Sequence, residues 1–346
     1  MKIAVVSSFV PFIDGGGRFI VEWLVQKLLE HGHQVEKIYL PSDESNESVL
    51  QTLLSYRLLN VADSTDRMIA IRPPAHTIRH PNKVVWFIHH MRSYYDLADT
   101  PYGSVLNNGD GHALRDAIRT HDTLALAEAK AIFTNSKIVG DRLLKFNGLQ
   151  SRVLYPPLLD ISKYYNGAAN DEIVSVCRLE AHKRQDLLVR AMAHVKSPVK
   201  LRIAGSSSNE SYERRLRNLV KDFGLQDKVK LDIGWLAENE KVHCVSRSLA
   251  SVYAPQDEDS YGYPTLEAAA AYRPTLTCLD SGGTLEFIRD GENGLIVEPT
   301  PLAIAEGFDR FYLDKLHTVR MGQSANATIQ DLGIRWDHVI KQLTAA

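Results

Sequence analysis

The feature that most constrains the fold is the alternation of short apolar runs with segments of helical periodicity. Residues 2–7 form the first apolar run, and residues 15–17 are three consecutive glycines. Apolar residues then recur at helical spacing over residues 20–29, and residues 35–40 form the next apolar run. The order strand, glycine loop, helix, strand is typical of the start of a parallel, doubly wound sheet.

The same alternation continues along the chain, and it is interrupted once. The interruption comprises Pro156, Pro157 and the polar stretch 166–170. A chain of 346 residues also exceeds what a single core usually holds. We therefore predict an α/β fold with doubly wound parallel-sheet domains at 1–165 and 166–325, and a closing helical segment at 326–346. Further strands are predicted at 68–71, 83–88, 131–135, 152–155, 173–177, 199–204, 229–233, 251–254 and 275–279, and a surface loop at 98–111.

Composition argues against several classes of protein. The net charge of -2 lacks the basic excess of a nucleic-acid-binding protein. No apolar run approaches the roughly 18 residues of a membrane-spanning helix, and the N-terminus resembles a core strand more than a signal peptide. Cys177, Cys244 and Cys278 are isolated, which favours buried thiols over a zinc site. We expect a cytoplasmic protein, with peripheral association at the inner face of the membrane as an alternative.

The strongest chemical signal is an acidic segment that leads into a helix. Asp259 and Glu267 flank a turn that contains Gly262 and Pro264. Proline suits the start of a helix, and a carboxylate in the first helical turn is favoured by the helix dipole. Carboxylates beside exposed backbone N–H groups match the hydrogen-bonding needs of a sugar ring or a ribose. A capped helix behind a solvated acidic loop is the alternative interpretation.

The second signal is the basic segment 177–184, between a predicted strand and a helix that begins near residue 185. It contains Arg178 and Lys183. Basic side chains at a strand-to-helix turn are well placed to meet phosphate. The alternative is an exposed basic turn without a ligand. We also expect Lys183 to be an exposed turn lysine that contributes little to stability, so that Lys183→Ala would leave the melting temperature nearly unchanged.

Two glycine-rich loops also follow predicted strands. Gly15, Gly16 and Gly17 allow a backbone to approach a ligand closely, but they do not form the dinucleotide fingerprint G-x-G-x-x-G. Gly282 and Gly283 lie in a strand-to-helix turn whose N–H groups could bind a sugar or a phosphate. A simple turn is the alternative for the first loop.

A histidine pair ends the strand predicted at 83–88. His89 and His90 lie where ligands usually bind in α/β sheets, although the sequence does not show which of them points inward. A metal site is the rival interpretation, but a third ligand at a convincing spacing is missing. Arg92, Tyr94 and Tyr95 follow, and they are expected either to line an acceptor site or to lie in a solvated loop.

Together, these segments resemble the family-four, or group 1, retaining glycosyltransferases. The acidic segment is similar to the family signature of two Glu separated by seven residues, with Asp259 in place of the first Glu and Glu267 as the second. Arg178 and Lys183 match the positions that hold the donor diphosphate. The resemblance implies the GT-B fold, with two Rossmann-like domains facing across a cleft and a last helix that returns to the first domain, anchored by Trp336.

The resemblance also implies residue roles, without a cofactor or a metal. A catalytic role is implied for His89, His90, Arg178, Lys183 and Asp259. Donor binding is implied for Gly15, Gly16, Gly17, Arg178, Lys183, Asp259, Tyr261, Gly262, Tyr263, Glu267, Gly282 and Gly283. An acceptor-side position is implied for Arg92, Tyr94 and Tyr95.

The predicted function is retaining transfer of a hexose from a UDP- or GDP-sugar to a glycan, lipid-linked or small-molecule acceptor, as in polysaccharide biosynthesis. Two alternatives stay open. One is a nucleotide-sugar epimerase of the same fold, and the other is a non-catalytic nucleotide- or carbohydrate-binding protein. No nucleic-acid partner is expected.

Overall fold

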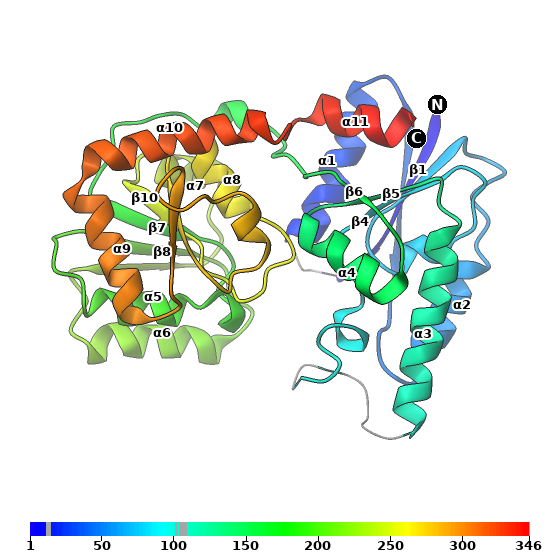
Figure 1. Ribbon diagram of the computed structural model, residues 1–346, viewed down its shortest axis with the longest axis horizontal. Helices are drawn as coiled ribbons and strands as arrows, with labels where there is room; N and C mark the ends of the chain where they lie inside the picture. Colours follow the sequence, from blue (N-terminus) through cyan, green and yellow to red (C-terminus); the bar gives the residue numbers. More distant parts are fainter. Residues whose placement is uncertain (12–14, 101–102, 104–108, 346) are drawn as a thin grey trace. The chain divides into compact units, whose positions relative to one another are not determined.

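The computed structural model describes residues 1–11, 15–100, 103 and 109–345, and the chain divides into two compact units (Figure 1). Unit 1 contains Met1–Pro156 and Ile334–Ala346, and unit 2 contains Pro157–Gly333. The chain therefore changes unit between Pro156 and Pro157 and again after Gly333, whereas the sequence analysis placed the boundaries after residues 165 and 325. Residues 101, 102 and 104–108 of the expected surface loop lie outside the described residues.

Unit 1 is built on a six-stranded sheet in the order β2-β1-β3-β4-β5-β6, in which all neighbouring strands are parallel. Its strands are β1 (Lys2–Phe9), β2 (Gln34–Pro41), β3 (Arg67–Ala70), β4 (Lys83–Phe87), β5 (Ala131–Thr134) and β6 (Arg152–Val153). Its helices are α1 (Gly16–Glu30), α2 (Val49–Arg57), α3 (Gly109–Ala127), α4 (Lys137–Asn147) and α11 (Trp336–Ala345), with short 3-10 turns η1 (Ala75–Thr77) and η2 (Arg92–Tyr94).

Strand β1 shows why this sheet is covered on both faces. Ile3 and Val5 belong to one apolar cluster, which also contains buried residues of α1 and α11. Ala4 and Val6 belong to another, which contains buried residues of α4. A strand that is apolar on both sides is typical of the central part of a parallel sheet, because helices pack on each face.

The closing helix α11 belongs to unit 1. The ring of Trp336 packs edge-on against Trp86 of β4, with 6.5 Å between ring centroids. The Arg67 guanidinium donates a hydrogen bond of 2.8 Å to the carbonyl of Leu343. Both contacts fix α11 on the same face of the sheet as α1.

Unit 2 contains a second six-stranded parallel sheet, in the order β12-β11-β10-β7-β8-β9. Its strands are β7 (Glu172–Val176), β8 (Lys200–Gly205), β9 (Val229–Ile233), β10 (Ala250–Val252), β11 (Thr275–Cys278) and β12 (Gly294–Val297). Its helices are α5 (Gln185–Met192), α6 (Glu210–Asp222), α7 (Glu238–Ser246), α8 (Tyr263–Ala270), α9 (Pro301–Leu313) and α10 (Lys315–Asp331), with 3-10 turns η3 (Ile161–Lys163), η4 (Ala181–Lys183) and η5 (Gly283–Glu286).

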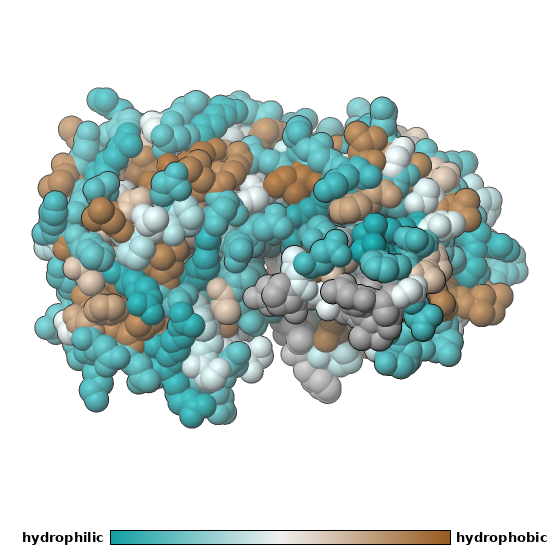
Figure 2. Space-filling model, turned by 60° about the horizontal axis from the view of Figure 1, so that its bottom comes forward, coloured by the Kyte–Doolittle hydropathy of each residue, from teal (hydrophilic) through white to brown (hydrophobic). Residues whose placement is uncertain are grey.

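Each strand predicted from the sequence is present, and β12 is an additional edge strand beside β11. Figure 2 shows a mostly hydrophilic face on which hydrophobic residues lie in scattered groups. None of the helices that the structure describes combines the length and the apolar character needed to cross a bilayer.

Candidate functional site

The carboxyl ends of three neighbouring strands in unit 2 bring the basic and the acidic segments together. The segment after β7 carries Lys183, the segment after β10 carries Glu258, and the segment after β11 carries Gly282 and Gly283. Since β7, β10 and β11 are adjacent and parallel, their carboxyl ends meet at one edge of the sheet. This edge is where open α/β sheets usually bind ligands.

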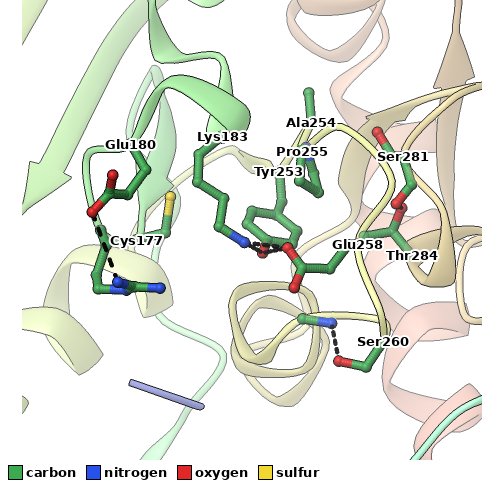
Figure 3. Close-up of polar contacts among 12 residues, drawn as sticks. Cys177, Glu180, Lys183, Tyr253, Ala254, Pro255, Glu258, Ser260, Ser281 and Thr284 are labelled. Atoms are coloured by element: carbon green, nitrogen blue, oxygen red, sulfur yellow. Dashed lines mark hydrogen bonds and ion pairs between the residues drawn. The ribbon is translucent and has the colours of Figure 1, made fainter. Parts of the chain in front are cut away.

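Lys183 is the centre of a compact polar cluster (Figure 3). Its Nζ donates a hydrogen bond of 2.7 Å to the hydroxyl of Tyr253 and is in direct contact with the carboxylate of Glu258. The Tyr253 hydroxyl in turn donates to Glu258, at 2.8 Å. The Lys183 side chain is only 9 % exposed, so the expectation of an exposed turn lysine is wrong. Its ammonium is held in place before any ligand arrives.

The charges in this cluster are mutually stabilised. Burial alone would raise the pKa of Glu258, but the positive charge of Lys183 and the hydrogen bonds from Lys183 and Tyr253 hold it below its ordinary value. Burial and the neighbouring carboxylate raise the pKa of Tyr253 well above its ordinary value. At neutral pH the cluster therefore contains an ionised carboxylate and a neutral phenol.

The acid that contacts Lys183 is Glu258, which lies next to Asp259 in the sequence and was not among the predicted site residues. Asp259 itself is half-buried in the same loop. Sequence spacing favours Asp259, because only Asp259 stands eight positions before Glu267. The run of acids at 257–259 was the available signal, but spacing alone does not show which member turns toward the lysine.

Arg184, another residue that the sequence analysis did not single out, ties the loops of this site together. Its backbone is left-handed, with φ of 56°. Its guanidinium donates to the carbonyls of Ala254 and Pro255, at 2.8 and 2.7 Å, and to both carboxylate oxygens of Asp280 at 2.7 Å. One side chain thus fixes the segments that follow β7, β10 and β11.

Two glycines of the site are required by close packing. Gly262 has φ of 74°, and a Cβ atom built there would lie 2.2 Å from the ring of Tyr253. Gly282 has φ of 64°, and a Cβ atom would lie 2.5 Å from the carbonyl oxygen of Glu258. The N–H of Gly283 donates to that same carbonyl at 2.8 Å, so this group supports the acidic loop instead of facing a ligand.

Glu267 lies in the first part of α8, where Pro264 occupies the helix start. The carboxylate is buried and accepts a hydrogen bond of 2.7 Å from Nζ of Lys241 on α7. Burial raises the pKa of Glu267 above its ordinary value, although the charge of Lys241 opposes this. Lys241, which the sequence analysis missed, is thus the counter-ion that helps to keep this carboxylate ionised.

Arg178 and Tyr261 lie in contrasting surroundings. The Arg178 side chain is 44 % exposed, and its guanidinium lies 3.7 Å from the carboxylate of Glu180, so it can reach a ligand. Tyr261 is fully buried, and its ring packs 6.0 Å from that of Phe287. The implied contact of the Tyr261 side chain with a donor is therefore not supported. Tyr263 is half-buried at the first position of α8.

In unit 1, the structure distinguishes the two histidines after β4. His90 is buried, with Nε2 at 2.9 Å from the side-chain oxygen of Asn147 and its ring 4.2 Å from that of Tyr95. His89 is half-buried, and its Nδ1 lies 2.6 Å from the carbonyl of His90. Burial lowers the pKa of each to about 4, with the charge of Arg72 adding to the effect at His89.

The hydrogen bond of His89 determines what its other nitrogen can do. A carbonyl oxygen only accepts, so Nδ1 of His89 carries the hydrogen. Because the ring is neutral at pH 7, Nε2 presents a lone pair. Of the two histidines, His89 is therefore the one that can accept a hydrogen bond from a hydroxyl of a ligand.

The residues expected on the acceptor side are mostly part of the core of unit 1. Tyr94 and Tyr95 are buried, and their hydroxyls donate to the carbonyl of Glu44 at 2.6 Å and to Asp122 at 2.7 Å. The half-buried Arg92 pairs with Asp96 at 2.6 Å. The two tyrosines therefore support the loop after β4 and do not line a surface for an acceptor.

The glycine loop of unit 1 leads directly into α1. This helix begins at Gly16, and Gly15 is its extended N-cap, without a side-chain cap. Gly17 lies in the first helical turn. In the described part of the chain, no group of three or more His, Cys, Asp and Glu residues could hold a metal ion.

Each unit is thus a helix-covered parallel sheet, and unit 2 presents a charged site at the carboxyl edge of its sheet. Solved structures show that the chain as a whole has the GT-B fold of glycosyltransferases. Anabaena HepE, crystallised with UDP, matches with a TM-score of 0.75 and 16% identity over 100% of both chains. A sucrose-phosphate synthase from Thermosynechococcus elongatus matches with a TM-score of 0.79 and 17% identity, over 99% of this chain and 97% of the other.

Sequence comparison then identifies the family of unit 2. Residues 166–328 match the family model described as "Glycosyl transferases group 1", and the chain therefore carries a domain of this family. An alpha-1,3/1,6-mannosyltransferase of Dictyostelium discoideum is 26% identical over 37% of this chain and 30% of its own length. A GDP-mannose-dependent phosphatidylinositol monomannoside mannosyltransferase of Mycobacterium tuberculosis is 26% identical over 53% of this chain and 49% of its own length. The chain thus spans about half or less of the length of these relatives.

Proposed function

We propose that the protein is a retaining glycosyltransferase that moves a hexosyl group from a UDP- or GDP-sugar to a hydroxyl of an acceptor. The observation that carries the proposal is the buried Lys183, held by Glu258 and Tyr253 at the carboxyl edge of the sheet in a group 1 glycosyltransferase domain. The relatives support this donor class, since one is named as GDP-mannose-dependent and a structural neighbour was crystallised with UDP.

The charges of unit 2 suit the cleavage of a sugar–diphosphate bond. As the bond between the anomeric carbon and the phosphate oxygen breaks, negative charge accumulates on the diphosphate. The ammonium of Lys183 and the exposed guanidinium of Arg178 stabilise that charge. Because Lys183 is already fixed by two partners, little reorganisation is needed at the moment of reaction.

The proposed transfer proceeds on one face of the sugar. The acceptor oxygen forms the new bond to the anomeric carbon on the side from which the diphosphate departs, and the acceptor proton passes to the leaving phosphate oxygen. The products are the glycoside and the nucleoside diphosphate, and no covalent intermediate with the protein is required. This route follows from the family resemblance.

Glu267 is proposed to hold the ribose of the donor. Its carboxylate is buried, and Lys241 favours the ionised form. An ionised carboxylate accepts hydrogen bonds from the two ribose hydroxyls, and hydrogen bonds to charged groups are the stronger kind. Asp259 is proposed to contact the donor sugar from the neighbouring loop.

The test is a donor panel with product analysis. Thermal stability is measured with UDP, GDP and ADP, since a ligand at 100 times its Kd stabilises a protein by about 2.7 kcal/mol. The sugar nucleotides of the base that binds are then incubated with candidate acceptors, and NMR of the product gives the anomeric configuration. A product with the donor's anomeric configuration supports the proposal. Inversion, epimerised sugar without an acceptor, or binding without turnover across the panel contradicts it.

A further inference from the structure

We propose that unit 1 contains a phosphate-binding site centred on Arg72, and that this site recognises a phosphate group on the acceptor. The assignment to the acceptor rests on the proposed function, whereas the site itself rests on the structure of unit 1. Arg72 lies just beyond β3, at the carboxyl edge of the sheet.

The backbone around Arg72 is firmly held. Ile71 donates its N–H to the carbonyl of Val6 at 3.0 Å, and the hydroxyl of Ser8 donates to the carbonyl of Pro73 at 2.6 Å. The carbonyl of Arg72 itself accepts from the N–H of Ala75 at 3.0 Å. The side chain therefore starts from a fixed point at the edge where β1, β3 and β4 end.

The guanidinium of Arg72 is half-buried and makes neither a hydrogen bond nor an ion pair with any residue that the structure describes. Its Nε is fully buried, and burial lowers the pKa of Arg72. Two other strongly buried cations of unit 1 do have partners: Arg67 donates from its terminal nitrogens to Leu343 and Asn82, although its Nε makes no hydrogen bond, and Lys83 donates to three backbone carbonyls. A cation that has lost part of its hydration without gaining a partner is costly, and an anion removes that cost.

The surroundings of Arg72 restrict the kind of anion. A Cβ atom built on Gly17, in the first turn of α1, would lie 3.3 Å from Cδ and 3.6 Å from Nε of Arg72. The guanidinium stem thus runs beside the N-terminus of α1, where free N–H groups and the helix dipole favour negative charge. A guanidinium beside such N–H groups offers several donors in different directions, which suits the oxygens of a phosphate.

The charge of Arg72 interacts with the titratable groups of Glu44, Tyr39, Tyr56 and His89. The carboxylate of Glu44 forms no ion pair with it, and burial raises the pKa of Glu44 against the opposing effect of the Arg72 charge. His89 is neutral and presents the Nε2 lone pair, so it accepts from a hydroxyl and does not bind the anion. A ligand that carries a phosphate beside a free hydroxyl matches Arg72 and His89. Because a glycosyl acceptor reacts through a free hydroxyl, such a ligand fits the role of the acceptor.

The test measures binding of inorganic phosphate by calorimetry, at constant ionic strength, to the full chain with and without saturating UDP or GDP. The nucleotide occupies the proposed Lys183 site, so that the remaining phosphate binding reports on Arg72. Arg72→Gln should weaken this binding by about tenfold or more, because a charged hydrogen-bonding partner is lost. Arg79→Gln is the matched control, since Arg79 is an exposed arginine before β4, at the opposite edge of the same sheet. It should bind phosphate like the wild type.

A second variant keeps the charge of Arg72 but displaces its side chain. Gly17→Ala adds a methyl group against Cδ of Arg72 at a helical position, and it should also weaken phosphate binding while α1 is retained. If Arg72→Gln and Gly17→Ala both bind phosphate as the wild type does, the site is refuted. If Arg72→Gln weakens UDP or GDP as much as phosphate, the anion is the donor's diphosphate and the acceptor assignment is wrong. Arg72-dependent phosphate binding in a protein that binds no nucleotide would support the site and contradict the proposed function.

Discussion

Glu258→Gln tests whether the ion pair between Glu258 and Lys183 contributes both to the free energy of unfolding and to nucleotide binding. The substitution keeps the shape of the side chain and an oxygen acceptor, and it removes the charge that faces Lys183. The two side chains are 9 % and 22 % exposed, so the pair is only partly screened by solvent. Breaking a fully buried pair costs about 3–5 kcal/mol. Since Glu258 is partly exposed and the amide still accepts from Tyr253, we expect a loss of about 1–3 kcal/mol in the free energy of unfolding.

The same substitution should change nucleotide binding in the opposite direction. In the wild type, a diphosphate that approaches Lys183 meets the carboxylate of Glu258 as a competitor and as a like charge. Without that charge, we expect UDP or GDP to bind more tightly and to restore part of the lost stability. Urea denaturation with and without nucleotide gives both quantities. Tyr253→Phe is the control, because it removes the two hydrogen bonds of the Tyr253 hydroxyl, each worth about 1 kcal/mol, and leaves the charges unchanged.

The pH dependence of stability provides a second test of the ion pair between Glu258 and Lys183. The pKa of Glu258 is lowered in the folded protein. Its contribution to stability is therefore fully present above the unfolded pKa of about 4.3 and is lost as the pH falls through the lower folded value. The stability of Glu258→Gln should therefore fall less steeply than that of the wild type as the pH is lowered. The reasoning on this cluster is wrong if the variant unfolds at the same urea concentration as the wild type, loses stability at low pH as steeply, and binds nucleotide with the same affinity.

Three further predictions follow from the same site. Lys183→Ala should lower kcat by about 10²–10³-fold in steady-state kinetics. It should also lower the urea midpoint, because Glu258 loses its counter-ion. A wild-type kcat would show that Lys183 has no catalytic role. Glu267→Gln should weaken UDP or GDP by about tenfold or more in calorimetry, since the ribose loses a charged acceptor; unchanged affinity would exclude the ribose role. Transfer activity should survive EDTA, because Lys183 and Arg178 supply the positive charge, and abolition that magnesium or manganese reverses would overturn this expectation.

The positions of the strands along the chain could be predicted, because they depend on patterns that are local in the sequence. Buried parallel strands give short apolar runs, and the residues after each run meet at one edge of the sheet. The choice between neighbouring side chains could not be predicted. Glu258 contacts Lys183 while Asp259 has the family spacing, and His89 presents a nitrogen to a ligand while His90 packs on Tyr95. These outcomes depend on loop geometry that is fixed by distant contacts.

The sequence analysis predicted no helix at 49–57 or at 315–325, and the physical reason is a different one. Helix α2 exposes Leu50 and Leu54 at 47 % and 57 %, while Leu53 is buried, so its apolar residues do not mark a single face. Helix α10 likewise exposes Leu316 and Val319. Arg184 was missed because its role depends on a left-handed backbone and on acceptors 70 or more positions away. Periodicity does not encode either property.

Lys183 and Arg72, both proposed as phosphate-binding groups, differ in whether a neighbouring group neutralises their charge before a ligand binds. Lys183 is compensated by Glu258 before a ligand binds, whereas Arg72 has no partner among the described residues. A compensated lysine contributes less to binding of the ground state, because its field is already partly neutralised. As the glycosidic bond breaks, the added negative charge on the diphosphate competes more strongly with Glu258 for the ammonium. The pair therefore favours the transition state over the bound donor, which raises turnover more than affinity. An uncompensated arginine does the reverse and serves recognition, which is consistent with a catalytic role for the site of unit 2 and a binding role for that of unit 1.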